Sequence, residues 1–165
     1  MSELEDREAI RQLIATYTIN GDRGRVQDMI SIFAEDARME TSAWIAEGRA
    51  GIFKALTTLG GERKTTAPEL KPDQRRIMRH HLTSCLITFD GPDEATGRTY
   101  WINFTEVGPD HAGLYADKFE RREGEWRIVS RDVRRDWVHP ESMAIGTGPG
   151  PRPADAPPRP VIRGD

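Results

Sequence analysis

The chain contains a single cysteine, Cys85, among its 165 residues. One cysteine excludes an internal disulfide and excludes metal sites that are built from several thiolates. Long hydrophobic runs are missing as well, since no stretch approaches the roughly 18 consecutive apolar residues of a membrane-spanning helix. The first residues, MSELEDREAIRQ, are acidic where a signal peptide would be basic and then apolar. We therefore expect a cytoplasmic protein that makes no contact with a membrane.

Neither sign of charge is in large excess, because 24 Lys and Arg stand against 27 Asp and Glu and give a formal net charge of −3. This slightly acidic balance argues against a general nucleic-acid binder. Lysine is scarce, with four lysines against twenty arginines. The planar guanidinium suits fixed pairs with carboxylates, so we expect several arginine ion pairs within the chain or at an interface.

The last part of the chain is rich in proline and glycine, with six prolines and four glycines from Ala144 onward. Apolar residues are almost absent there before Val161 and Ile162, so burial cannot offset the entropy cost of ordering this segment. We therefore expect one domain over residues 1–143 and a carboxy-terminal tail over 144–165. The tail could wrap a neighbouring subunit, cover a pocket or stay disordered.

The amino-terminal part shows helical periodicity. Ser2 and Glu5 form a capping box, and apolar residues then recur at intervals of three and four until Asn20-Gly21. A second helix is predicted from Val26 to about Asp36, and a third from about Arg49 to Leu59, where Gly60-Gly61 ends it. Short strands are predicted at 37–41 and 44–46. Residues 61–75 are polar and form a loop long enough to act as a flap.

After this loop the period of the apolar residues changes from 3.6 to 2, which predicts strands at 76–89, 95–107, 113–122 and 125–137. Four long strands joined by short turns make an antiparallel meander. Three helices against one face of a curved, mainly antiparallel sheet give an α+β fold. A small-molecule pocket is expected in the concavity between the helices and the sheet.

The chain has no cysteine pair and no Gly-x-Ser-x-Gly elbow, so its chemistry must come from Asp, His, Tyr and Arg side chains. Adjacent residues His80 and His81 point to opposite faces of a strand and cannot bind one metal ion together. The other histidines, His111 and His139, do not provide a metal-binding spacing either. We expect neither a metal nor a cofactor.

Two residues near the end of the first helix stand out. Tyr17 continues the apolar stripe of that helix, so it is either a core residue with a hydroxyl in need of a partner or a site residue. Asp22 follows five residues later, and it is either the N-cap of the second helix or a functional carboxylate. Local sequence alone favours the cap. For His80 and His81, alternation along the strand does not settle which side chain faces the pocket.

Several motifs together resemble the SnoaL-like family, which belongs to the nuclear transport factor 2-like superfamily with its cone-shaped fold. These motifs are Tyr-x4-Asp at residues 17–22, Glu-Asp-Ala at 35–37, Gly-Arg-x-x-Ile at 48–52, Arg-His-His at 79–81 and Gly-x-Trp-Arg-Ile at 124–128. The resemblance covers about residues 3–139. It implies the fold more specifically than the activity, because this fold hosts many unrelated functions.

Within the family, the pattern is similar to the cofactor-free lyases scytalone dehydratase, bile acid 7α-dehydratase and hexachlorocyclohexane dehydrochlorinase. These enzymes pair an Asp after the first helix with a His on the first long strand. The resemblance therefore implies an Asp22–His80 catalytic dyad, with Tyr17 as a hydrogen-bond donor and Arg131 as the group that stabilises negative charge. Substrate contacts are expected from Trp44, Asn103 and Tyr115.

Some positions differ from the family pattern, and these differences limit which activities the resemblance implies. Thr41 stands where ketosteroid isomerases carry their base, which disfavours that branch. Trp101 or Asn103 stands near the place of a second pocket histidine of scytalone dehydratase, so that enzyme's substrate is not inherited.

The expected function is a cofactor-independent elimination or proton shift on a hydrophobic cyclic molecule. Alternatives are a polyketide cyclase-like or hydrolase-like enzyme, and a non-catalytic small subunit of a ring-hydroxylating dioxygenase. Self-association as a dimer or trimer is expected in each case.

Overall fold

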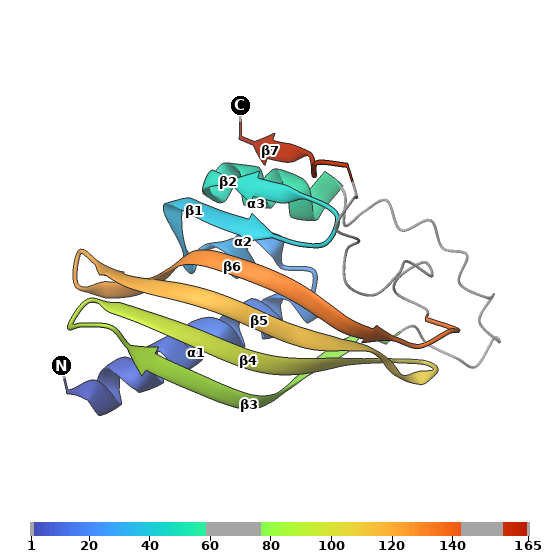
Figure 1. Ribbon diagram of the computed structural model, residues 1–165, viewed down its shortest axis with the longest axis horizontal. Coiled ribbons are helices and arrows are strands. Elements are labelled where there is room, and N and C mark those ends of the chain that lie inside the picture. Colours follow the sequence, from blue (N-terminus) through green and yellow to red (C-terminus); the bar gives the residue numbers. More distant parts are fainter. Residues whose placement is uncertain (1, 59–76, 143–156, 165) are drawn as a thin grey trace.

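The computed structural model describes residues 2–58, 77–142 and 157–164 (Figure 1). Three helices occupy the amino-terminal part, and the strands of one sheet make up most of the remainder. The helices are α1 (Glu3–Asp22), α2 (Val26–Ile30) and α3 (Gly48–Thr58). The strands are β1 (Phe33–Glu40), β2 (Ile45–Glu47), β3 (Arg79–Phe89), β4 (Glu94–Thr105), β5 (Gly108–Arg122), β6 (Glu125–Val138) and β7 (Val161–Arg163).

Helix α1 begins at the predicted capping box. The backbone N–H of Ser2 donates to the Glu5 carboxylate at 2.6 Å, and the Ser2 hydroxyl accepts from the backbone N–H of Glu5. Both bonds satisfy amide groups that have no partner inside the helix. The helix continues to Asp22, slightly beyond the predicted end at Asn20-Gly21.

The sheet has seven strands in the order β3-β4-β5-β6-β1-β2-β7. Strands β3 to β6 form the predicted antiparallel meander, while β1 runs parallel to β6 and antiparallel to β2. The described sheet is open, with β3 and β7 at its edges. Figure 1 shows the long strands curling around α1, so the predicted α+β fold with three helices on a curved sheet is confirmed.

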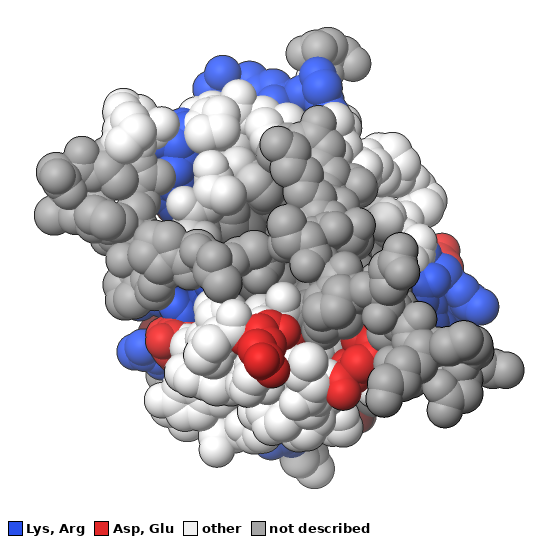
Figure 2. Space-filling model, turned by 90° about the vertical axis from the view of Figure 1, so that its right-hand side faces the viewer, with Lys and Arg blue, Asp and Glu red and all other residues white. Residues whose placement is uncertain are grey.

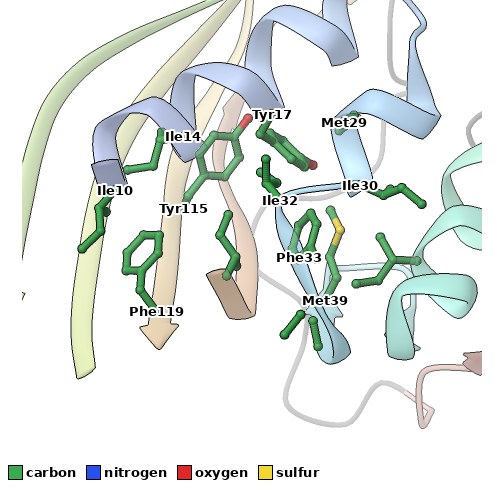
Figure 3. Packing of buried hydrophobic residues seen from close by; sticks show 14 of the residues in the cluster. Ile10, Ile14, Tyr17, Met29, Ile30, Ile32, Phe33, Met39, Tyr115 and Phe119 are labelled. Carbon is green, nitrogen blue, oxygen red and sulfur yellow. The ribbon is translucent and has the colours of Figure 1, made fainter. Parts of the chain in front are cut away.

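The core lies between the helices and the inner face of the sheet. Figure 3 shows Ile10, Ile14 and Tyr17 of α1 pointing towards Tyr115 and Phe119 of β5. These contacts bury apolar surface from elements that are far apart in the sequence, and such burial is the main force that holds the layers together.

The second helix is shorter than predicted. It ends at Ile30, and Phe33–Asp36, predicted to be its last turn, is instead the start of β1. Phe33 pairs with Ile128 of β6. The apolar spacing of this segment fits a helix, but a short run beside a sheet can also be buried as a strand, and pairing with β6 decides between the two.

The proline-rich end of the chain also differs from the prediction. Val161–Arg163, assigned from the sequence to a tail, forms β7 and pairs in parallel with β2. The domain boundary near residue 143 stays a prediction. The predicted flap at 61–75, the helix stop at Gly60-Gly61 and residues 144–156 of the predicted tail lie outside the described residues.

Arginine ion pairs are numerous, as predicted from the composition, and they include Arg7–Glu3, Arg134–Asp132 and Arg163–Glu47. Figure 2 shows one face on which the described basic and acidic side chains lie in small groups, with blue and red atoms beside one another at both the left and the right edge. No described helix is both long enough and apolar enough to cross a membrane.

Candidate active site

A cavity of about 410 Å³ lies between the helices and the inner face of the sheet. Its walls are mostly apolar and aromatic, and its polar groups come from two histidines, two tyrosines, an arginine and the hydroxyls of three small residues. The lining residues are Tyr17, Thr18, Gly21, Gly24, Val26, Met29, Met39, Thr41, Ser42, Trp44, Leu56, Met78, His80, Trp101, His111, Tyr115, Val133 and Arg135. Apolar walls with a few polar groups are typical of a small-molecule site.

Asp22 and His80 are in direct contact at this cavity. Asp22 Oδ1 lies 2.6 Å from His80 Nδ1, and the same carboxylate accepts the backbone N–H of His80 at 3.0 Å. With the carboxylate as acceptor, Nδ1 is the donor in this bond, and Nε2, at the other side of the ring, is left for a bound ligand. The Asp22 side chain is 9% exposed and that of His80 is 21% exposed, so His80 is the member that lines the cavity.

The alternative interpretation of Asp22 as a helix cap is wrong. Asp22 is the last residue of α1, and the residue at the N-cap of α2 is Arg25, whose side chain makes no capping bond. The role of Asp22 follows from its place at the end of α1. Helix α1 ends beside β3, so its last carboxylate reaches both the backbone and the ring of His80.

Alternation along β3 separates the two adjacent histidines. His80 faces the cavity, whereas the ring of His81 packs against Phe104 with centroids 5.0 Å apart. His80 pairs with Asn103 and His81 pairs with Ile102, which are adjacent residues of β4, so the two histidines lie on opposite faces of the sheet. Among the described residues, no three His, Cys, Asp or Glu side chains gather closely enough to hold a metal ion.

Arg131 is fully buried and does not line the cavity. Its Nε and Nη2 each donate to Asp117 at 2.7 Å, and its guanidinium carbon lies 4.1 Å from the Tyr17 ring centroid and 4.4 Å from that of Tyr115. Arg131 and Asp117 therefore stand behind the two tyrosines, which themselves face the cavity. Burial raises the pKa of both tyrosines, so their hydroxyls stay protonated and can donate.

Of the three residues predicted to contact the substrate, two line the cavity and one does not. Trp44 and Tyr115 line the cavity, whereas Asn103 is fully buried behind the wall, with its Nδ2 3.3 Å from His111 Nε2. The structure thus brings Tyr17, His80, Trp44 and Tyr115 to the cavity surface. Asp22, Arg131 and Asn103 contact that surface from behind.

A second Asp–His pair, not singled out from the sequence, lies in the same cavity wall. His111 Nδ1 is 2.6 Å from Asp110 Oδ1, and the Asp110 carboxylate also accepts the hydroxyls of Thr105 at 2.8 Å and Ser142 at 2.6 Å. The rings of His111 and His80 have centroids 6.2 Å apart. Burial lowers the pKa of His111, and the opposing effect of Asp110 is smaller, so His111 is neutral near pH 7.

The sequence did contain a signal for this pair, namely the adjacent Asp110 and His111. This adjacent pair was not considered as a site because residues 108–112 were predicted to be a loop. In the structure β5 begins at Gly108, and His111 lies four residues before Tyr115 on the same inward face of this strand. Arg135, which the sequence did not single out for the site, also lines the cavity, and burial lowers its pKa.

Comparisons with known proteins agree with this architecture. A family model described as a SnoaL-like domain matches residues 2–132. The comparison with curated proteins gives no significant match.

Solved structures with the same fold include enzymes and a subunit of an enzyme complex. A hexachlorocyclohexane dehydrochlorinase from Novosphingobium barchaimii is 20% identical, with a TM-score of 0.69 over 88% of this chain and 96% of that one. A candidate scytalone dehydratase from Novosphingobium aromaticivorans is 20% identical, with a TM-score of 0.68 over 93% and 97%. The beta subunit of a candidate aromatic-ring-hydroxylating dioxygenase from the latter organism is 17% identical, with a TM-score of 0.64 over 86% and 98%.

Proposed function

The chain belongs to the SnoaL-like domain family, and from that premise we propose that it is a cofactor-independent lyase or isomerase that removes a proton from carbon. The observation that carries the proposal is the contact between Asp22 and His80 at 2.6 Å, with His80 in the wall of an apolar cavity. An imidazole oriented by a carboxylate is a suitable general base, because the carboxylate selects its tautomer and stabilises the imidazolium that forms.

In the proposed reaction, His80 Nε2 takes a proton from a carbon next to an activating group. The C–H electron pair becomes the new C=C bond, and the bond to the leaving group breaks with its electron pair on that group. A leaving hydroxyl takes the proton back from the imidazolium and departs as water, whereas a halide departs as the anion. In an isomerisation, the proton returns to a different carbon.

Tyr17 is proposed to donate a hydrogen bond to the oxygen on which negative charge accumulates. Its raised pKa keeps the hydroxyl protonated, and a donor within a water-poor cavity stabilises developing charge more strongly than it would in water. Arg131 is proposed to support this role indirectly. Its cation lies against the rings of Tyr17 and Tyr115 and makes the surroundings of both hydroxyls more positive.

The cavity limits the size of the substrate. At roughly 30 Å³ for each water-sized group, about 410 Å³ corresponds to a molecule of one or two rings. Trp44, Trp101 and Tyr115 provide aromatic walls. These features support a hydrophobic cyclic substrate, as the family resemblance also implies.

Two kinds of substrate test the proposal. Chloride release from hexachlorocyclohexane and water loss from a bicyclic β-hydroxy ketone are measured with the wild-type protein and with the Asp22→Asn and His80→Gln variants. Removal of the base or of the carboxylate that orients it is expected to lower kcat by about 10²- to 10⁴-fold. His81→Gln is the matched control, because the neighbouring ring lies on the other face of the sheet. Undiminished turnover by a folded His80→Gln variant would show that the dyad is not the base.

The second candidate function is that of a non-catalytic subunit. The similarity in fold to a dioxygenase beta subunit favours it. Purification from the source cells distinguishes the two candidates, because a subunit is expected to copurify with a larger iron-bearing chain. A free protein that turns over a substrate through His80 is expected only of the enzyme. A cyclase-like or hydrolase-like reaction in the same cavity remains a further proposal, and the same variants test it.

Self-association is also proposed. The outer face of the sheet exposes Leu86, Tyr100 and Trp137, with 65%, 52% and 43% of their surfaces accessible. Large exposed apolar side chains on one face are typical of an interaction surface. Light scattering would determine the mass and would distinguish a dimer or trimer from a monomer. The expected cytoplasmic location stays a prediction.

A further inference from the structure

Residues 157–164 lie beyond the part of the chain that the family model matches, yet they join the fold beside the cavity. Strand β7 pairs in parallel with β2, and the backbone N–H of Ile45 donates to the carbonyl of Pro160 at 3.0 Å. Close contact with α3 holds this strand in place. A Cβ on Gly51 would lie only 2.7 Å from the carbonyl oxygen of Ile162, so only glycine allows the two backbones to approach this closely.

One side chain of this segment reaches the turn between β1 and β2. Arg159 Nη1 donates to the carbonyl oxygen of Thr41 at 2.7 Å, and Nη2 donates to the Glu40 carboxylate at 2.5 Å. The Arg159 side chain is 24% exposed and that of Glu40 is 19% exposed. Hydrogen bonds that involve a charged partner and are partly shielded from water are stronger than ordinary surface contacts.

The turn that Arg159 contacts supplies one wall of the cavity. Thr41, Ser42 and Trp44 all line it. The turn closes on itself, because the Thr41 hydroxyl accepts the backbone N–H groups of Ala43 and Trp44 at 3.1 Å. In addition, the backbone N–H of Thr41 donates to the carbonyl of Trp44 at 2.9 Å. A group that fixes the Thr41 carbonyl therefore fixes the whole turn, including the indole of Trp44.

We propose that Arg159 is a positioning residue for ligand binding: by bonding to Thr41 and Glu40, it holds the 41–44 turn so that Trp44 completes the cavity wall. The inference rests on the cavity of the proposed function as the ligand site, and it does not depend on the chemistry of Asp22 and His80. Preorganised walls bind more tightly because less ordering entropy is lost when the ligand enters. Arg159 thus acts on affinity and leaves the proton-transfer step unchanged.

Arg163, four residues after Arg159 in the same described segment, provides a matched control. Its guanidinium pairs with Glu47 at 2.7 Å, but its side chain is 65% exposed, and neither residue lines the cavity. Arg163→Gln removes one positive charge from residues 157–164, as Arg159→Gln does, without removing a contact with the 41–44 turn. Arg159→Lys keeps the positive charge and one of the two hydrogen bonds.

The test measures binding of 2-naphthol, an apolar bicyclic alcohol, to the full-length protein by calorimetry. We expect the dissociation constant to rise about tenfold in Arg159→Gln, to rise less in Arg159→Lys and to change less than about twofold in Arg163→Gln. With any substrate that the wild-type protein turns over, Arg159→Gln is expected to raise KM and to leave kcat unchanged. Circular dichroism checks that each variant is folded. If Arg159→Gln does not fold, the naphthol affinity of Arg159→Lys tests the proposal instead.

Three results would overturn the proposal: unchanged naphthol affinity in Arg159→Gln, an equal loss in Arg163→Gln, and no naphthol binding by the wild-type protein. Variants of the Asp22–His80 dyad are expected to show the opposite effects on binding and on kcat. Asp22→Asn, whose side chain lies behind the cavity wall, is expected to lower kcat and to retain naphthol binding, so failure of the lyase proposal and failure of the positioning proposal are separately visible.

Discussion

Arg131 has the largest fully buried side chain among the described residues. Its charge is balanced by Asp117 through two hydrogen bonds of 2.7 Å, and the rings of Tyr17 and Tyr115 cover the guanidinium. Burial of two charges costs much solvation free energy, so such a pair adds little net stability while both partners are present. Removal of one partner leaves an uncompensated buried charge.

Asp117→Asn is therefore expected to lower the free energy of unfolding by about 3 kcal/mol or more. The control is Asp132→Asn, because Asp132 pairs with Arg134 where both side chains are substantially exposed. Loss of that exposed pair is expected to cost less than about 1 kcal/mol. Urea denaturation measures both values. Equal effects of the two substitutions would contradict the account of a buried charge that needs its partner.

The family resemblance singled out Asp22, His80 and Tyr17, which residue types and spacing alone did not, and the structure places His80 and Tyr17 in the cavity wall with Asp22 behind His80. The same reasoning misplaced two groups. Arg131 lies behind the wall rather than in it, and His111 lies in the wall without having been singled out. Arg131 is covered by the rings of Tyr17 and Tyr115, and His111 belongs to a strand that begins earlier than predicted, so both differences depend on tertiary packing.

At the scale of elements, α1 and the four long strands follow from periodicity, whereas α2 and β1 do not. The segment 26–36 has apolar residues at helical spacing, yet only Val26–Ile30 is helical. Phe33 and Ala34 are buried in the strand that follows. Pairing of β1 with β6 provides backbone hydrogen bonds and burial together, and this tertiary gain overrides a weak local preference.

Strand β7 depends on a glycine in a helix. In an exposed helix, Gly→Ala is stabilising by about 1 kcal/mol. Gly51→Ala is expected to be destabilising instead, because the new methyl group would meet the Ile162 carbonyl at 2.7 Å and displace β7. The backbone amide of Ile45, which donates to Pro160, is then expected to exchange hydrogen faster.

Gly21→Ala in α1 is the control for Gly51→Ala, since its Cβ would meet only the flexible end of Met29 at 3.3 Å. It is expected to be neutral or stabilising. Thermal unfolding compares the two variants, and amide exchange reports on β7. Stabilisation by Gly51→Ala with unchanged exchange at Ile45 would show that β7 does not need the close approach.

At the scale of the whole molecule, the stability is expected to depend on pH through His111. In the unfolded chain a histidine titrates near about 6.5, and burial lowers the pKa of His111 in the folded protein. Between these two values the unfolded state binds more protons, so the free energy of unfolding falls as the pH falls from about 6.5 through the folded-state pKa. Above about 6.5 this contribution is fully present.

Urea denaturation across this pH range measures the effect. His111→Gln is expected to flatten the pH dependence, while His81→Gln on the outer face is expected to retain it. The groups that act on His111 are Asp110, His80 and Arg135, so His80→Gln separates any contribution of the neighbouring imidazole. An unchanged pH dependence in His111→Gln would assign it to other groups.

The sequence by itself determined the α+β class, the capped first helix, the antiparallel meander and the absence of a disulfide, because periodicity, capping and composition are local properties of the chain. Only the tertiary structure decided which side chains form the site. Asp22 and His80 are 58 residues apart, and Arg159 and Thr41 are 118 apart. Such contacts depend on how helices and strands pack and on the register of each strand, which no local pattern specifies.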